Sequence, residues 1–320
     1  MSWNVFVTRR IPEPGLEILR RECEIVDVHP EDRVMTREEM LAAVPGRDGV
    51  LCLLTDRVDE EVMAAADRAK GFANYAVGYD NIDLEAARRR GLVVSNTPGV
   101  LTDATADMAW ALLFSAARRV VAADKHMRSG EWNGWGPMQF LGADITGATL
   151  GVVGTGRIGE NFARKSAGFA MPLLYTDPRP NEGLERDLGA RRVPLEELLR
   201  VSDFVSLHPP FLPETEKLIG ERELGLMKPT AVLINTSRGK VVDEEALVRA
   251  LRAGRPGAAG LDVYAEEPRP APGLVELENL VCCPHIASAT TRTRSRMAEM
   301  AARDLLAILR GDPPANQVCP

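Results

Sequence analysis

Five side chains that could perform acid–base chemistry follow predicted strands in the second half of the chain. They are His208, Arg238, Asp262, Glu267 and His285. Because the carboxyl ends of parallel strands meet at one edge of a sheet, we expect these side chains to converge there. An Arg binds a carboxylate with two parallel N–H groups, a His transfers protons near neutral pH, and a carboxylate favours the charged form of that His. A histidine at such a position is often only structural, so the residues alone do not choose between the two histidines.

A glycine-rich turn indicates what the second reactant is. The run 150–159 reads as a buried strand, a turn with Gly154 and Gly156, and a helix that begins near Gly159. Asp177 follows about 20 residues on, the spacing of a Rossmann unit that binds a dinucleotide. An acid there accepts hydrogen bonds from the ribose of NAD and repels the extra phosphate of NADP, whereas Arg179 could pair with that phosphate. We therefore favour NAD, with NADP as the alternative. A hydride donor beside an Arg, a His and a carboxylate suits the reduction of a 2-keto acid.

Short apolar runs and amphipathic segments alternate on both sides of this motif, which predicts parallel sheets with helices on both faces. The fold class that we expect is α/β, with two doubly wound parallel-sheet domains of Rossmann or flavodoxin-like type and a cleft between them. The predicted strands are 3–7, 25–28, 50–54, 72–75, 92–94, 204–207, 231–235, 259–262 and 281–283. The predicted helices are 16–21, 37–43, 60–69, 84–89 and 292–309.

A long helix is expected after Thr102, with an apolar side that runs from Ala106 to Val120. The pattern then breaks between about residues 127 and 144, where Trp132 and Trp135 stand among glycines. This segment is either a surface loop or an arm that docks on a second subunit, since exposed tryptophans favour interfaces.

Composition excludes several classes of protein. The 320 residues suffice for two domains, and 45% hydrophobic and 27% charged residues are ordinary for a globular protein. A net charge of −7 argues against nucleic-acid binding, and no apolar run is long enough to span a membrane. Five cysteines without framework spacing predict a reducing compartment, and we expect a cytoplasmic location and no metal site. His29 and His126 stand in polar settings and are expected to be solvated.

Taken together, the motifs resemble those of the D-isomer-specific 2-hydroxyacid dehydrogenases, over essentially the whole chain. Within this family the chain looks most like the glyoxylate and hydroxypyruvate reductases. The pieces that carry the resemblance are 5–10, 51–56, 77–83, 130–135, 154–159, 206–210, 235–239, 260–263 with 267–268, and 284–293.

The resemblance implies roles for particular residues. Arg238 would bind the substrate, His285 would be the acid–base, and Glu267 would pair with His285. Backbone N–H groups of the turn Val77–Gly78 would hold the substrate carboxylate. Leu54 and Trp135 would line a small pocket, with Trp135 reaching from a partner subunit. The cofactor would contact Thr105, Gly154, Gly156, Arg157, Ile158, Gly159, Asp177, His208, Pro209, Thr236, Ser237, Asp262 and Ala287.

The resemblance also implies an organisation. Residues 1–99 with 287–320 would form the substrate domain and 100–286 the NAD-binding domain. A homodimer would form through the long helix and the tryptophan-rich arm, around residues 120–145. Ala287 stands where the family usually has Gly, so its methyl group would crowd the nicotinamide. Another 2-keto acid, phosphoglycerate, formate or phosphite remain alternative substrates, and a non-catalytic NAD-sensing scaffold of the corepressor kind remains an alternative function.

Overall fold

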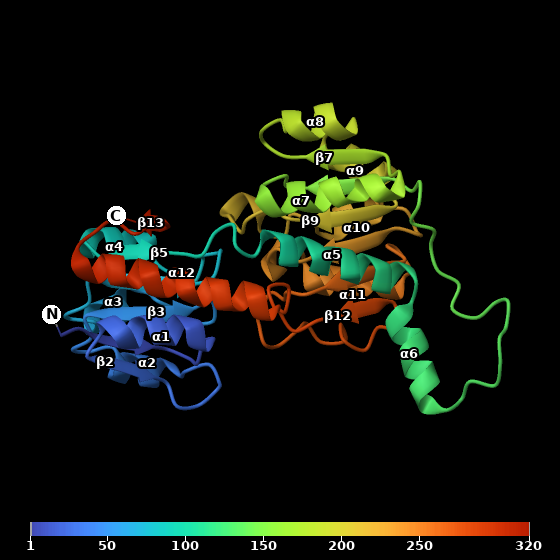
Figure 1. Cartoon of the computed structure of the whole chain (residues 1–320). Coiled ribbons are helices and arrows are strands. Elements are labelled where there is room, and N and C mark those ends of the chain that lie inside the picture. Colours follow the sequence, from blue (N-terminus) through green and yellow to red (C-terminus); the bar gives the residue numbers. More distant parts are fainter. Residues whose placement is uncertain (1, 320) are drawn as a thin grey trace. The chain divides into compact units, whose positions relative to one another are not determined.

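The computed structural model describes residues 2–319, which form two compact units (Figure 1). The first unit consists of the chain up to Leu101 and from Ala289 onward, and the second unit is Thr102–Ser288. Each unit is built around its own sheet.

The first unit contains a six-stranded sheet with the order β13-β5-β4-β3-β1-β2. Five of these strands are parallel, and β13 pairs antiparallel with β5 at one edge. The strands are β1 Asn4–Val7, β2 Ile25–Val28, β3 Gly49–Leu53, β4 Gly71–Tyr75, β5 Val93–Ser95 and β13 Gln317–Cys319.

Helices cover both faces of this sheet. α12 packs on α1 and on β3 and β4, and its N-cap is Thr290, whose side chain accepts the N–H of Thr293. The opposite face buries a cluster that includes Met40 from α2, Val62 from α3 and Ala86 from α4. The helices are α1 Glu13–Glu22, α2 Arg37–Ala43, α3 Glu60–Ala65, α4 Leu84–Arg90 and α12 Thr291–Arg310.

The second unit contains a seven-stranded sheet, all parallel, with the order β12-β11-β10-β9-β6-β7-β8. The strand order reverses between β6 and β9, which is where open α/β sheets bind ligands. The strands are β6 Leu150–Val153, β7 Leu173–Thr176, β8 Arg191–Arg192, β9 Phe204–Leu207, β10 Val232–Asn235, β11 Ala258–Leu261 and β12 Leu280–Cys282.

The register of this sheet aligns the strand ends. Val153, Leu207, Asn235, Leu261 and Cys282 are successive partners across five strands. The residues that follow them along the chain therefore leave the sheet at one common edge.

Two apolar layers enclose the second sheet. One layer includes Leu113 of α5, Phe162 of α7 and Leu184 of α8. The other includes Leu198 of α9 and Leu247 of α11. The helices are α5 Thr102–Ala117, α6 Val120–Ser129, α7 Arg157–Lys165, α8 Glu182–Leu188, α9 Leu195–Val201, α10 Glu221–Leu226 and α11 Glu244–Arg252. No helix within residues 2–319 is long and apolar enough to cross a membrane.

The predicted α/β class with two parallel sheets is confirmed, but some local predictions are wrong. The long helix stops at Ala117, because Arg119 adopts a left-handed conformation and the N–H of Ala143 binds the Ala117 carbonyl oxygen at 2.9 Å. Val120 therefore begins α6 and is 50% exposed instead of continuing an apolar side.

Two further predictions need correction. The helix predicted over 60–69 ends at Ala65, since the N–H of Lys70 binds the Asp48 carbonyl oxygen and draws the chain into β4. His29 is buried instead of solvated, and its Nδ1 lies 2.9 Å from the carbonyl oxygen of Glu31.

Candidate active site

The centre of the site in the second unit is a pair formed by His285 and Glu267. The imidazole Nδ1 of His285 lies 2.8 Å from Glu267 Oε2 and 3.1 Å from Oε1. Both side chains are about one quarter exposed, so the pair is accessible to a small molecule. With Nδ1 engaged by the carboxylate, Nε2 is the nitrogen that remains to exchange a proton.

Asp262 fixes the turn that carries His285. Its carboxylate accepts the N–H groups of Ile286 at 2.8 Å and Ala287 at 2.7 Å, and its carbonyl oxygen accepts the N–H of His285 at 2.9 Å. His285 itself has a φ of 55°, a left-handed conformation that costs energy in a non-glycine residue and is held here by the three bonds. Burial raises the pKa of Asp262, and the two N–H groups oppose that rise.

The electrostatics favour a charged Glu267. Burial alone would raise its pKa, but the hydrogen bond and charge of His285, the N–H of Tyr264 and the charge of Arg238 lower it below the usual value. Arg238 follows β10, where its Nη1 donates to the carbonyl oxygen of Ser237 at 2.8 Å. The carboxylate is therefore an anion at neutral pH, in hydrogen-bond contact with Nδ1 of the imidazole.

His208 differs sharply from His285. It follows β9, its Nε2 lies 2.8 Å from Ser206 Oγ, and its ring packs against Phe162. Burial lowers the pKa of His208 to about 3. His208 is therefore neutral at physiological pH, and of the two histidines only His285 has a charged partner.

The glycine-rich turn has the shape that a pyrophosphate requires. Gly154 has a φ of +85°, and a Cβ on Gly159 would lie 2.0 Å from the carbonyl oxygen of Gly154. A Cβ on Gly156 would meet nothing within 4 Å, so the backbone before α7 faces open space. The buried Thr236 Oγ1 has no hydrogen-bond partner within the described chain. An open helix N-terminus and an unsatisfied hydroxyl at the same sheet edge fit a bound dinucleotide.

Asp177 stands at the end of β7 beside this turn. Its carboxylate accepts the N–H of Thr155 at 2.8 Å and the N–H of Arg179 at 3.0 Å. Each oxygen keeps a further lone pair that can accept a ribose hydroxyl. The Arg179 backbone is thus tied to the acid while its side chain lies on the surface.

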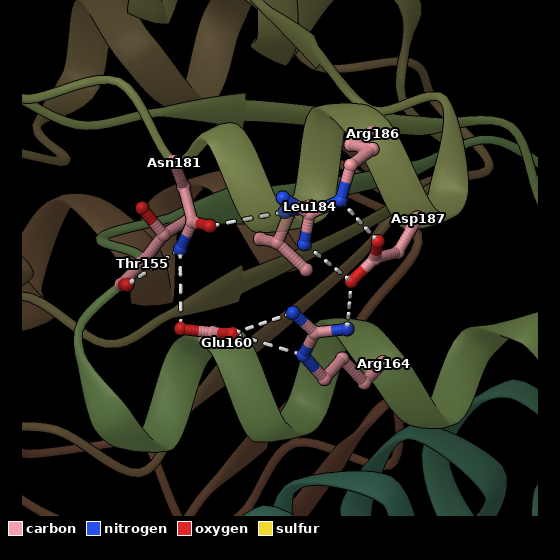
Figure 2. A network of polar contacts seen from close by, with 7 residues as sticks. All are labelled: Thr155, Glu160, Arg164, Asn181, Leu184, Arg186 and Asp187. Carbon is pink, nitrogen blue, oxygen red and sulfur yellow. Dashed lines mark hydrogen bonds and ion pairs between the residues drawn. The ribbon is translucent and has the colours of Figure 1, made fainter.

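A network of polar contacts holds the segment after Asp177 (Figure 2). Asn181 caps α8 by accepting the N–H of Leu184, and its Nδ2 lies 3.3 Å from both the Thr155 carbonyl oxygen and Glu160 Oε2. Glu160 in turn pairs with Arg164 along α7. This network fixes the loop that would face the adenosine ribose.

The predicted cofactor residues that follow β6, β9 and β10 lie at the same edge. Thr105 is buried in the first turn of α5, and Ser237 donates its N–H and Oγ to Asn235 Oδ1. The backbone of Pro209 packs next to Gly154. Arg157 and Ile158 form the first turn of α7.

The first unit presents a backbone turn at Val77 and Gly78. Asn96 Nδ2 donates to the carbonyl oxygen of Val77 at 2.7 Å, and Asn74 Nδ2 donates to that of Gly78 at 2.8 Å. Because a trans peptide places C=O and N–H on opposite sides, the N–H of Gly78 faces away from Asn96. Leu54, which follows β3, is 38% exposed.

The segment from Gly130 to Thr149 has no helix or strand, as the break in the sequence pattern predicts. Trp135 is 84% exposed, and Trp132, Met138 and Leu141 are also exposed. So much exposed apolar surface on one segment is unusual for a chain that acts alone.

Known proteins of one family resemble this chain. Residues 110–287 match the family described as "D-isomer specific 2-hydroxyacid dehydrogenase, NAD binding domain". A relative named glyoxylate reductase, from Korarchaeum cryptofilum, is 51% identical over 320 residues, which are 99% of this chain and 96% of the relative.

Solved structures extend the likeness. The TT0316 protein from Thermus thermophilus is 45% identical with a TM-score of 0.91, over 98% of this chain and 99% of that one. An NADPH-dependent glyoxylate/hydroxypyruvate reductase from Sinorhizobium meliloti, solved with NADP and malonate, is 31% identical with a TM-score of 0.86, over 99% of this chain and 97% of that one. The chain belongs to the D-isomer-specific 2-hydroxyacid dehydrogenases, and its second unit contains the NAD-binding domain of that family.

Sequence reasoning missed the residues that hold the site in place. Asn74 and Asn96 orient the 77–78 turn, and Tyr264 supplies an N–H to Glu267. Asn74 follows apolar residues within a predicted strand, and a polar residue in a buried strand is the one signal that could have pointed to it.

Proposed function

We propose that this chain is a glyoxylate reductase that also reduces hydroxypyruvate, with NADH as the favoured donor. The observation that carries the proposal is the pair of His285 and Glu267, 2.8 Å apart, at the ligand-binding edge of a dinucleotide-binding sheet. A relative of that name, half identical over nearly the whole chain, supports the choice of substrate.

The cofactor would be held by the turn 154–159, Asp177 and the hydroxyl of Thr236. When bound, it supplies the hydride that reduces the carbonyl carbon. The charge of Asp177 favours NADH, because a carboxylate beside the ribose repels a 2′-phosphate. In this proposal Asp262 holds the nicotinamide carboxamide while it anchors the turn of His285.

Arg238 would bind the carboxylate and the ketone oxygen of the substrate through its planar fork of N–H groups. In the first unit, the N–H of Gly78 would offer a separate binding group for a carboxylate. His285 would deliver a proton from Nε2 to the carbonyl oxygen, and Glu267 would keep the imidazole protonated until then. Arg238 and His285 together stabilise the negative charge that develops on that oxygen.

The exposed arm supports a further part of the proposal, a homodimer formed through α6 and the segment after it. Trp132, Trp135 and Met138 would then be covered by the second copy, and Trp135 would line the substrate pocket of that copy together with its Leu54. Light scattering should give twice the mass of one chain. A monomer at micromolar concentration would contradict this arrangement.

The test of the activity is a parallel assay of NADH and NADPH oxidation with glyoxylate, hydroxypyruvate, pyruvate and phenylpyruvate. Glycolaldehyde, which lacks the carboxylate, is the matched control. We expect the highest kcat/KM with glyoxylate or hydroxypyruvate and almost none with glycolaldehyde. A preference for phenylpyruvate would overturn the proposal that glyoxylate or hydroxypyruvate is the substrate. Tight NADH binding without turnover would favour the alternative function, a non-catalytic NAD-sensing scaffold.

The same assay tests the cofactor preference through Asp177→Asn. Removal of the charge should reduce the preference for NADH over NADPH about 10-fold or more, since a charge-assisted hydrogen bond contributes about 1.5–3 kcal/mol. An unchanged preference would remove Asp177 from that role.

A further inference from the structure

Glu244 is a buried carboxylate that the reaction described above does not use. It is the first residue of α11, after the N-cap Asp243, and only 7% of it is exposed. Its Oε1 accepts the N–H of Ala265, and its Oε2 accepts the N–H of Ala271 at 2.9 Å. One side chain thus holds two points of the loop 264–271.

Glu267 lies between those two points. The same loop supplies the N–H of Tyr264 to Glu267 Oε1 at 3.1 Å, and the hydroxyl of Tyr264 donates to the carbonyl oxygen of Cys283 at 3.0 Å, two residues before His285. The loop that Glu244 holds therefore carries the carboxylate and also contacts the chain that leads to the imidazole.

A close backbone contact joins this loop to Arg238. A Cβ on Gly239 would lie 1.8 Å from the carbonyl carbon of Tyr264, so only glycine fits at that point. The segment after Arg238 and the start of the loop are consequently in van der Waals contact. A displacement of the loop would change the distance of Glu267 from both of its charged neighbours.

We propose that Glu244 is a positioning residue, which clamps the loop 264–271 so that Glu267 stays in hydrogen-bond contact with His285. The inference rests on the proposed roles of Glu267 and His285 and adds a residue that acts through them. Glu244 need not touch substrate or cofactor to affect the reaction.

Both carboxylate oxygens of the clamp accept a hydrogen bond. Both of its partners are N–H donors, and a glutamine in place of Glu244 would present its own NH₂ group to one of them. One arm of the clamp would open, and the buried N–H would lose its partner, which costs about 1–3 kcal/mol. The loop would then sample positions in which Glu267 is farther from the imidazole.

Other titratable side chains also lie near the pair of His285 and Glu267. Arg238 and Asp262 face it from the ends of β10 and β11, and the phenol of Tyr264 is kept neutral because burial raises its pKa. Glu266 lies 3.5 Å from Lys240 Nζ, toward the surface. Glu244→Gln leaves each of these groups in place, so a change in pH dependence would report on the pair itself.

The experiment compares the pH profile of kcat/KM for glyoxylate, at saturating NADH, in the full-length wild type, Glu244→Gln, Glu245→Gln and Glu267→Gln. Glu245 is the exposed neighbour in the same helical turn, so its variant controls for the lost charge. In the reductive direction activity falls as pH rises, because the imidazole must be protonated. Loss of the Glu267 charge should move that fall to lower pH.

Glu244→Gln should move the fall in the same direction by a smaller amount, with the Kd for NADH unchanged, and Glu245→Gln should overlay the wild type. If Glu267→Gln shifts the profile and Glu244→Gln does not, the clamp is wrong while the proposed function stands. If Glu267→Gln gives no shift, the pairing of Glu267 with His285 is wrong and the clamp with it. Should Glu244→Gln fail to fold, Glu244→Asp, which keeps the charge but shortens the reach, must show a shift to lower pH, and an unshifted profile overturns the proposal.

Discussion

The two units present binding groups of different kinds. In the second unit, charged side chains at strand ends form the candidate site: Glu267 pairs with His285, and Asp262 holds the turn that carries His285. In the first unit, the corresponding feature is main chain, the turn Val77–Gly78, whose carbonyl groups are held by the neutral amides of Asn74 and Asn96.

This difference separates proton transfer from anion binding. An imidazole and a carboxylate titrate, so a site that they form depends on pH. A backbone N–H does not titrate, so a turn that offers one binds an anion equally well across the physiological range. We therefore propose pH-dependent chemistry in the second unit and pH-independent anion binding in the first.

The largest effect is expected from His285→Gln. Loss of a general acid typically lowers the rate about 10²–10⁴-fold, and we expect kcat for glyoxylate to fall by that amount. The Kd for NADH, measured by fluorescence, should change little. His126→Gln, on α6, is the matched control, and a wild-type kcat in His285→Gln would show that proton transfer does not depend on His285.

Arg238→Lys should have the next largest effect. A point charge replaces a planar fork, and the loss of one charge-assisted hydrogen bond, about 1.5–3 kcal/mol, corresponds to a 10- to 100-fold lower kcat/KM. The change should appear as a higher KM for glyoxylate together with a lower kcat. Steady-state kinetics with an unchanged KM would contradict carboxylate binding by this side chain.

A smaller effect is expected from Asn96→Ala in the first unit. The Val77 carbonyl loses its donor, so the peptide that presents the N–H of Gly78 is less well oriented. A neutral hydrogen bond contributes about 0.5–1.5 kcal/mol net, which predicts a 2- to 10-fold higher KM for glyoxylate and an unchanged kcat. Asn4→Ala, in the same unit, is the control. A lower kcat without a change in KM would contradict the assignment of anion binding, and not proton transfer, to the first unit.

The smallest effect on the reaction, but a clear one on stability, is expected from His208. Its pKa is about 3 when folded, against an ordinary value of 6.5, so below pH 6.5 the unfolded chain takes up a proton that the folded chain does not. Stability is consequently lost as pH falls from about 6.5 toward 3. The thermal unfolding midpoint should decrease less steeply over this range in His208→Asn than in the wild type, and parallel curves would contradict an imidazole that stays neutral in the folded chain.

The sequence was sufficient to predict features that depend on residue type and on the order of strands and helices. The α/β class follows from alternating apolar runs and helical segments, and the aligned ends of β6, β9, β10, β11 and β12 follow from their being parallel. Arg238, Glu267 and His285 are among five candidates that follow predicted strands, and only the family resemblance assigned roles to these three. That these strand ends share an edge was predictable, because parallel connectivity leaves few alternatives.

The sequence was insufficient where a residue acts by holding backbone. Glu244 looks like an ordinary acid in the first turn of a helix, and only the fold brings Ala265 and Ala271 to it. β13 was missed because a three-residue edge strand has too little pattern to detect. The end of α5 at Ala117 depends on the N–H of Ala143, a contact made by residues far along the chain.

The most direct test of the account is the pH dependence of kcat/KM for glyoxylate in the wild type, His285→Gln and Asn96→Ala. We expect the wild type to lose activity as pH rises through the range of imidazole titration, and His285→Gln to be low and flat. Asn96→Ala should run parallel to the wild type at a constant fraction of its value. A His285→Gln profile that keeps the wild-type bend, or an Asn96→Ala profile shifted along the pH axis, would contradict the division of chemistry and binding between the two units.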